Sequence, residues 1–204
     1  MLAPAAERAR FRHTAVIKET RGHDPRSISY VGSSPRGRAS SDRARHTMLY
    51  RQFVDSWDGR FVYHAPEGVP REAPCEVHFG WALEGRAVQD VWIVPSRSAR
   101  QAPGVSAPGI LYGTTLRVYD PRSDLWHIIW IDPLRQDYDR MTGRKVGDDI
   151  IQEYRMEDGT RCQWLFTEIT ASSFHWIRRE SKDGEAWNVR VDFFLRRRMT
   201  DSRA

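Results

Sequence analysis

The chain has 204 residues, with 32 Lys or Arg against 27 Asp or Glu and a formal net charge of +5. This length suits a single domain that carries an extension. The excess positive charge lies in residues 1–47, which carry a net charge of +6, whereas residues 48–204 carry −1. Because the larger part is nearly neutral, we expect it to have no nucleic-acid partner. We predict two parts: a basic extension, 1–47, and a folded domain, 48–204.

Residues 1–47 are rich in Arg, Ser, Gly and Pro, and all eight Trp of the chain follow residue 56. Such a segment buries too little apolar surface to offset the entropy lost on ordering. We therefore expect a disordered extension, or a start codon assigned upstream of a true start at Met48. An organelle transit peptide and a nucleic-acid-binding arm are the alternatives. Aromatic residues do not interleave with the charges, which disfavours the arm.

The sequence has no apolar segment typical of a secretory signal and none long enough to span a membrane. We therefore expect a cytoplasmic protein with no membrane partner. A nucleophile elbow, a Gly-rich phosphate loop and a zinc-protease helix motif are all absent. Cys75 and Cys162 have no Cys or His at ligand spacing. Because His64, His78, His127 and His175 are also far apart in sequence, we predict no metal and no cofactor.

Most of the folded part alternates apolar and polar residues in short runs separated by Gly, Asp or Pro turns. Period-two alternation is typical of antiparallel strands, and regular turns between them indicate a meander that closes on itself. Before the strands, residues 48–57 place Leu49, Phe53 and Trp57 four apart, which predicts a short helix that plugs or covers the barrel. Residues 96–109 form one long polar loop beside the mouth. We predict ten strands: 60–65, 76–83, 86–95, 110–119, 125–132, 138–144, 149–156, 161–169, 173–181 and 186–198.

Alternation also predicts which side chains face the interior. In the last strand the apolar set is Trp187, Val189, Val191, Phe193 and Leu195. The same rule, applied to the other strands, gives an interior rich in Trp and Phe, which either fills the core or holds a flat apolar ligand. The further inward sets are Val77, Phe79, Trp81 and Leu83; Val88, Asp90, Trp92 and Val94; Tyr112, Thr114, Leu116 and Val118; Trp126, Ile128, Trp130 and Asp132; Cys162, Trp164, Phe166 and Glu168; and Phe174, Trp176 and Arg178.

Asp90, Glu168 and Arg178 are the charged residues that stand out on these apolar faces. A buried unpaired charge is unfavourable, so they should form an internal ion pair or meet a polar group of a ligand. The pair Asp137 and Asp139 lies at a strand end, where solvated carboxylates are common. We predict that the ligand contacts Arg178, Tyr112, Thr114, Tyr63, Trp92, Trp126, Trp130, Trp164 and Trp176.

The strand 125–132 is apolar on both faces, because Leu125, Ile129 and Ile131 alternate with its inward set. An apolar outer face should be covered. The sequence leaves two covers open: the helix 48–57, or a second copy of the chain in a homodimer.

Four segments resemble an uncharacterised group of bacterial calycin-like barrels, related in shape to lipocalins and fatty-acid-binding proteins. They are 81–86 (WALEGR), 112–120 (YGTTLRVYD), 126–132 (WHIIWID) and 174–187 (FHWIRRESKDGEAW), and the similarity extends over about residues 48–198. The resemblance implies an all-β, antiparallel up-and-down barrel around a small hydrophobic ligand. It implies no catalytic residues, and the lipocalin Gly-x-Trp opening is absent.

Three functions fit these features. The leading hypothesis is a non-catalytic binder of a small hydrophobic or aromatic molecule, with Arg178 at its polar or anionic end. The second is an isomerase, cyclase or hydratase in the same cavity, with Asp90 or Glu168 as the acid–base group and Arg178 or Tyr112 as polar anchors. The third and weaker one is a haem-binding barrel, which needs a histidine at the mouth.

Overall fold

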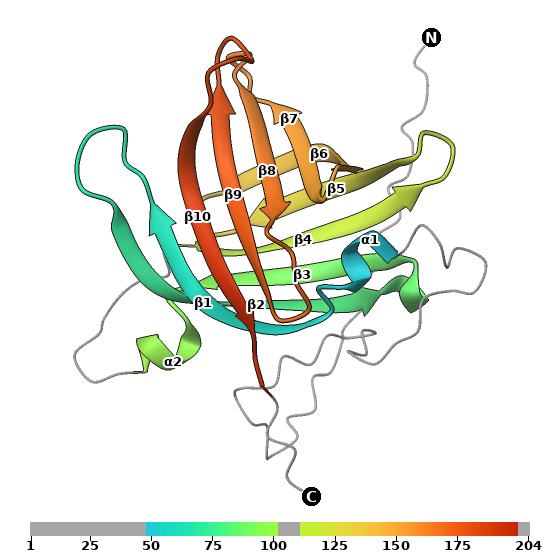
Figure 1. Ribbon diagram of the computed structural model, residues 1–204, viewed down its shortest axis with the longest axis horizontal. Coiled ribbons are helices and arrows are strands. Elements are labelled where there is room, and N and C mark those ends of the chain that lie inside the picture. The colour runs from blue at the N-terminus through green and yellow to red at the C-terminus, as the bar shows by residue number, and fades with distance from the viewer. Residues whose placement is uncertain (1–47, 102–110, 200–204) are drawn as a thin grey trace, which may run out of the picture.

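The computed structural model describes residues 48–101 and 111–199. Within these ranges ten antiparallel strands form one closed barrel in the order β1-β10-β9-β8-β7-β6-β5-β4-β3-β2 (Figure 1). Each strand therefore pairs with its neighbours in the chain, and β1 closes the barrel against β10. The predicted all-β, up-and-down barrel of about ten strands is confirmed. The predicted extension 1–47 and residues 102–109 of the predicted loop lie outside the described residues.

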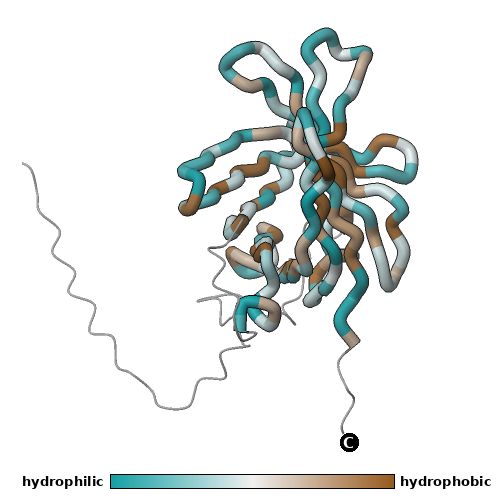
Figure 2. Tube along the Cα trace, turned by 90° about the vertical axis from the view of Figure 1, so that its left-hand side faces the viewer, coloured by the Kyte–Doolittle hydropathy of each residue, from teal (hydrophilic) through white to brown (hydrophobic). Residues whose placement is uncertain are grey.

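Short turns connect most strands, and Figure 2 shows hydrophilic residues at the tips of the hairpins and hydrophobic ones along the barrel wall. Among the described helices, none is both long and apolar enough to cross a membrane. The short helical elements are α1 (Met48–Arg51), η2 (Leu83–Gly85) and α2 (Arg97–Arg100). The strands are β1 (Asp55–Tyr63), β2 (Arg71–Ala82), β3 (Ala87–Val94), β4 (Leu111–Asp120), β5 (Leu125–Asp132), β6 (Asp137–Val146), β7 (Asp149–Arg155), β8 (Arg161–Thr167), β9 (Ser173–Ser181) and β10 (Asn188–Arg197).

The predicted helix 48–57 is much shorter in the structure, because α1 ends at Arg51 and β1 already begins at Asp55. Tyr50 and Phe53 from this segment nevertheless belong to the buried core. The ring centroid of Tyr50 lies 4.9 Å from that of Trp126, and that of Phe53 lies 4.8 Å from that of Phe166. The segment therefore fills one end of the barrel, as expected of a plug.

The last strand contains a bulge that alternation does not reveal. Val189 pairs with Arg179, whereas Val191 pairs with Arg178, so the register shifts between them. A bulge adds one residue and reverses the facing of everything before it. Val191 is buried, but Val189 is 39% exposed, and Trp187 stacks under Arg179 at 4.8 Å. The predicted inward facing of Val189 and Trp187 is therefore wrong.

The predicted facing of β4 is also wrong. The structure buries Gly113, Thr115 and Arg117 and leaves Tyr112 41% exposed on the outer surface, with Thr114 also outside. The register explains the result, because inward-facing Asp90 of β3 pairs with Thr115. The more apolar side of β4 is therefore its outer side, which the rule of apolar residues inside cannot anticipate.

Two residues predicted to face inward lie where strands have ended. Leu83 has φ 50° and is 59% exposed, and Glu168 has φ 52° and is exposed at the end of β8. Positive φ values turn the chain out of the strand conformation, so alternation stops there. The expectation that Glu168 lies among apolar neighbours inside the barrel is wrong.

The described residues leave the outer face of β5 exposed. Ile129 is 49% exposed and Ile131 is 39% exposed, whereas Trp126, Ile128 and Trp130 face the core as predicted. The segment around α1 packs into the barrel end, with Tyr50 and Phe53 in the core. The helix is thus not the cover, and a second copy of the chain stays a prediction.

Candidate functional site

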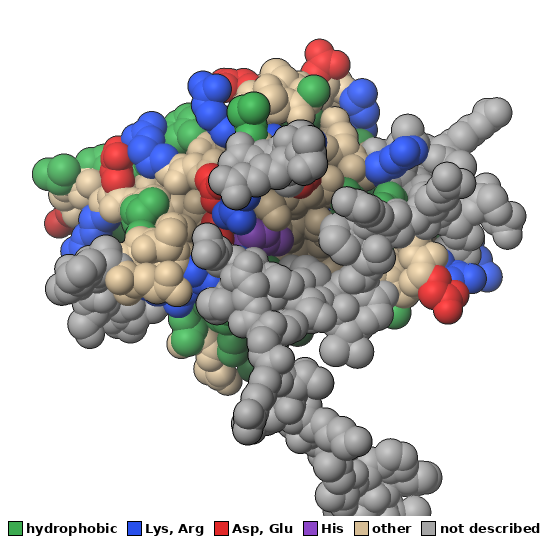
Figure 3. All heavy atoms as spheres, turned by 90° about the horizontal axis from the view of Figure 1, so that it is seen from below, with side chains coloured by type: hydrophobic (Ala, Val, Ile, Leu, Met, Phe, Trp, Pro, Cys, Tyr) green, Lys and Arg blue, Asp and Glu red, His purple; other side chains and the backbone are tan. Residues whose placement is uncertain are grey.

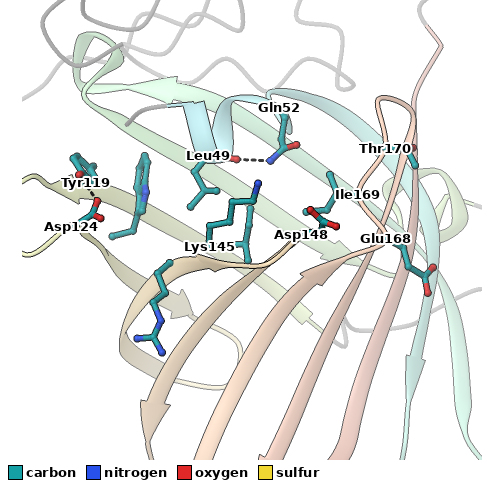
Figure 4. A pocket seen from close by; sticks show the side chains of 12 residues that line it. Leu49, Gln52, Tyr119, Asp124, Lys145, Asp148, Glu168, Ile169 and Thr170 are labelled. Atoms are coloured by element: carbon teal, nitrogen blue, oxygen red, sulfur yellow. Dashed lines mark hydrogen bonds between the residues drawn. The ribbon is translucent and has the colours of Figure 1, made fainter. Parts of the chain in front are cut away.

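Two of the hollowed regions of the barrel differ in character. Beside α1 is a wide groove of about 1070 Å³, whose walls come from α1 and from the loops at the same barrel end (Figure 4). Two of its polar side chains have partners nearby: Gln52 Nε2 donates to Leu49 O at 2.7 Å, and the Tyr119 hydroxyl donates to Asp124 at 2.7 Å. The bond to Asp124 raises the pKa of Tyr119 to about 12. Lys145, Asp148 and Glu168 also line this groove.

The second region is a small cavity at the opposite end, which we call the tryptophan cavity. It has a volume of about 80 Å³, and its wall contains Trp92, Trp130, Trp164 and Trp176. These four indoles come from β3, β5, β8 and β9, and each occupies an inward position of its strand. They form a continuous row, with ring centroids 5.2 Å apart for Trp92–Trp176 and Trp164–Trp176 and 5.4 Å apart for Trp130–Trp164.

Apolar and charged residues complete this cavity on different sides. Leu111, Val191 and Phe193 extend the apolar wall, and the charged residues come from the ends of β5, β6 and β9. A mainly apolar concave wall with a few convergent polar groups is the usual form of a small-molecule site. The charged lining residues are Asp132, Arg135, Asp137, Asp139 and Arg178.

Arg178 is charged and already has a carboxylate partner. Its Nη2 lies 2.8 Å from Glu180 Oε1, and Arg190 Nε lies 2.9 Å from the other oxygen of Glu180. Burial works against the charge of Arg178, but the nearby Cys162, Tyr154 and Glu180 outweigh it and raise the pKa. The predicted internal ion pair of Arg178 thus exists, with a residue two positions along the same strand.

Asp139 is half-buried and lies near Tyr154 and Arg178. Burial raises the pKa of Asp139 above its usual value, and Tyr154 and Arg178 offset this only in part. Asp139 pairs across the sheet with Trp130, so the carboxyl group lies beside an indole of the cavity wall. It is the carboxyl group of the cavity whose environment most resembles that of an acid–base or cation-binding residue.

Asp132 at the end of β5 is fully buried. Its Oδ1 accepts hydrogen bonds from the backbone N–H of Leu134 at 2.9 Å and of Arg135 at 3.3 Å, which holds the turn to β6. Its Oδ2 has no hydrogen-bond partner among the described residues. A buried carboxylate oxygen without a hydrogen-bond donor is unfavourable. A donor group is therefore expected next to Asp132 Oδ2.

Of the predicted ligand contacts, the structure brings together Arg178, Trp92, Trp130, Trp164 and Trp176. The others lie elsewhere. Trp126 packs against Tyr50 at the plugged end, and Tyr63 is partly buried against the core without lining the cavity. Tyr112 and Thr114 are on the outer surface; Thr114 donates to the backbone O of Asp90 at 2.5 Å.

Asp90 is buried as predicted, but in the closed core and with an unexpected partner. Its Oδ1 accepts from Thr115 N at 2.9 Å, and its Oδ2 accepts from Arg117 Nη1. The Arg117 guanidinium is fully buried and lies 4.9 Å from the ring centroid of Tyr50. Because neither Asp90 nor Arg117 lines the tryptophan cavity, the predicted acid–base role of Asp90 has no accessible site. The sequence did not predict Arg117 as the partner of Asp90, because the alternation rule placed the wrong face of β4 inward.

Asp132 and Asp139, which line the cavity, and Tyr154, which is hydrogen-bonded to Asp139, are the residues that sequence reasoning left without a role. Asp139 was assigned to ordinary solvated carboxylates because a second acid, Asp137, and a turn precede it. Asp139 lies two residues before Met141, which is buried on the inward face of β6. Because residues two apart on a strand share a face, this spacing could have placed Asp139 on the inward face.

The described histidines lie outside the tryptophan cavity. His64 and His175 each place Nε2 2.6 Å from an oxygen of Asp192, and His127 is exposed. In the described part of the chain, no group of three or more His, Cys, Asp or Glu could hold a metal ion. The cavity therefore does not fit the histidine ligand that a haem-binding barrel requires.

His78 joins a charged network on the barrel surface with Ser56 and Glu76, and Figure 3 shows His, Arg and acidic side chains gathered on one face. His78 Nδ1 lies 2.8 Å from Ser56 Oγ, while its Nε2 lies 3.0 Å from Arg97 Nη2. Nε2 also lies 3.4 Å from Glu76 Oε2, so His78 links Ser56, Arg97 and Glu76 in one network.

Fold and site together define a closed ten-stranded antiparallel barrel that is plugged at one end and carries a Trp-walled cavity at the other. The crystal structure of Rv2717c from M. tuberculosis is similar, with a TM-score of 0.53, 13% sequence identity, and coverage of 76% of this chain and 98% of that chain. At this identity the similarity shows the fold alone. No protein-family model and no curated protein matches the chain.

Proposed function

We propose that this protein is a calycin-like barrel that binds a small molecule in the tryptophan cavity without transforming it. The observation that supports the proposal is the row of four indoles at one end of a barrel whose other end is filled by Tyr50 and Phe53. Indole faces bury a large apolar area against a ligand, and this wall is presented by strands, which are rigid elements. The ligand on this view is a compact apolar or aromatic group.

An isomerase, cyclase or hydratase is less well supported by the geometry. Asp90 is sealed in the core by Thr115 and Arg117, and Glu168 is exposed at the plugged end, where it lines the wide groove. Neither carboxyl group can reach a molecule in the tryptophan cavity. Binding is therefore the function that the arrangement favours.

The test is a titration of the full chain with 3,3-dimethylbutan-1-ol, whose tert-butyl group suits a small apolar cavity. Because the wall is made of Trp, we expect a saturable change in intrinsic fluorescence. Val191→Phe places extra bulk on the cavity wall and should weaken binding at least tenfold. Val189→Phe is the matched control, since Val189 lies on the same strand but on the outer surface.

Unfolding curves of both variants establish that they fold before their affinities are compared. Saturable binding by the wild type that is lost only in Val191→Phe supports the proposal. Equal affinities of the two variants for the alcohol contradict it.

A further inference from the structure

Three carboxylates lie at one corner of the tryptophan cavity, on two paired strands. Asp132 of β5 is directly opposite Asp137 of β6, and Asp139 follows two residues later on the same face. Like charges directly opposite each other in a sheet repel and destabilise it. All three line the cavity, so a cation placed there would relieve this repulsion.

One of these carboxylates lacks part of the hydrogen bonding that a buried acid normally has. Asp132 is 0% exposed, and its Oδ2 has no hydrogen-bond partner in the described part of the chain. Arg178, a partly buried cation of the cavity, makes its short ion pair with Glu180, and its charge offsets only part of the upward pKa shift of Asp139. Arg135 contributes its backbone N–H to Asp132, while its own side chain is in the exposed turn.

The wall opposite the carboxylates is of the kind that attracts organic cations. An indole face carries negative electrostatic potential, and Trp is the aromatic side chain that binds a cation most strongly. Four indoles line this cavity, and Trp130 is the cross-strand neighbour of Asp139. Aromatic faces next to carboxylates form the usual recognition site for alkylated ammonium groups.

The size of the cavity limits the group that can enter. One water molecule needs roughly 10–15 Å³ of comparable space. A volume of about 80 Å³ therefore suits a compact group of a few non-hydrogen atoms, with the rest of the ligand outside the mouth. A trimethylammonium group is of this size.

An anionic ligand is the alternative, since Arg178 also lines the cavity and the indole N–H groups of Trp164 and Trp176 have no hydrogen-bond acceptor among the described residues. Both indoles, however, pack edge to face against a neighbouring indole, at 82° for Trp130–Trp164 and 68° for Trp164–Trp176. An aromatic face accepts weak hydrogen bonds from N–H groups. With Arg178 paired to Glu180, Asp132 Oδ2 is the carboxylate oxygen of the cavity that has no hydrogen-bond partner among the described residues.

We propose that the tryptophan cavity recognises an alkylated ammonium group, held between the indole faces and the carboxylates of Asp132 and Asp139. This inference rests on the proposed binding function and names the chemical class of its ligand. The positive charge, rather than the apolar bulk alone, should then determine affinity.

Three probes of nearly equal shape separate charge from bulk. Choline carries a trimethylammonium group, 3,3-dimethylbutan-1-ol is its neutral counterpart with carbon in place of nitrogen, and 3,3-dimethylbutanoate is an anion of similar size. In Trp-fluorescence titrations of the full chain, we expect choline to bind at least tenfold more tightly than the alcohol and the anion to bind most weakly.

Two substitutions test the carboxylates. Asp139→Asn and Asp132→Asn should each weaken choline binding at least fivefold and change binding of the alcohol less than twofold. Asparagine keeps an acceptor oxygen for the turn N–H groups, so Asp132→Asn preserves the local hydrogen bonds. Asp148→Asn, at the groove of the plugged end, is the control and should leave both affinities unchanged.

The outcomes separate this inference from the proposed function. Equal affinities for choline and the alcohol, tightest binding of the anion, or unchanged choline affinity in both Asp→Asn variants would each overturn the cation proposal while leaving the cavity a binding site. Absence of binding by all three probes would contradict both proposals.

Discussion

Arg117 and Asp90 form an ion pair that is completely buried in the core. Arg117 Nε and Nη2 have no hydrogen-bond partner among the described residues, but the guanidinium lies near the rings of Tyr50, Phe79 and Phe166 at 4.9, 5.7 and 5.7 Å. Cation–π attraction is strongest when the cation has lost its water. The rings thus take the place of solvent around the half of the guanidinium that Asp90 does not reach.

Removal of one partner from this pair should be much more damaging than removal of both. Arg117→Leu leaves Asp90 as an uncompensated buried charge, and we expect a loss of about 3–5 kcal/mol in the free energy of unfolding. The double variant Asp90→Val/Arg117→Leu should lose far less, because buried ion pairs replaced by apolar residues are often neutral in stability. Urea unfolding monitored by Trp fluorescence measures both. A double variant as unstable as the single one would contradict this explanation.

At the scale of secondary-structure elements, the cavity wall depends on how closely β4 approaches β5. Gly113 lies on the inward side of β4, and a Cβ atom there would come within 2.3 Å of Trp130 Cη2 and 2.8 Å of Ile131 O. Trp130 therefore lies across the strand at Gly113. Because Trp130 is one of the four wall indoles, a single glycine sets the position of part of the cavity.

Gly113→Ala should displace Trp130 and destabilise the fold by about 1–3 kcal/mol, the usual effect of overpacking. Gly80→Ala is the matched control: Gly80 is also a strand residue, but nothing lies within 4 Å of its added Cβ. Alanine in a strand interior is about 0.5–1 kcal/mol more favourable than glycine where space allows. Thermal unfolding reports stability, and the emission spectrum of the Trp residues reports displacement. Equal effects of the two substitutions would show that the close approach at Gly113 is unimportant.

How much of the structure the sequence predicts differs from element to element. Alternation is clear in β5, β8 and β9, so Trp130, Trp164 and Trp176 were correctly placed on the inner wall. On β4 both faces contain apolar and polar residues, and the tertiary register to β3 decides between them. Alternation also carries no information on which charged residues pair. Arg178, for example, forms its ion pair with Glu180 on its own strand.

For the whole molecule, the outer surface of β4 to β6 is an apolar face that residues 48–101 and 111–199 leave exposed. Tyr112, Ile129, Ile131 and Tyr138 are 41%, 49%, 39% and 64% exposed. They are contiguous, since Ile131 pairs with Tyr138 and lies opposite Thr114, two residues from Tyr112. Monomeric proteins rarely expose contiguous apolar patches of several side chains, and such patches mark interaction surfaces.

A homodimer formed through this face is the remaining prediction from the sequence, and a single charge should separate its subunits. Ile129 is the more exposed isoleucine of the patch, so Ile129→Glu would bury a carboxylate in the interface and shift the equilibrium toward monomer by at least tenfold in dissociation constant. Sedimentation velocity over a range of concentrations measures this shift. Val146→Glu is the control, since Val146 is 43% exposed at the end of β6, next to the turn to β7. A wild-type protein that sediments as a monomer at all concentrations, or a control that dissociates equally, would show that this face does not join two subunits.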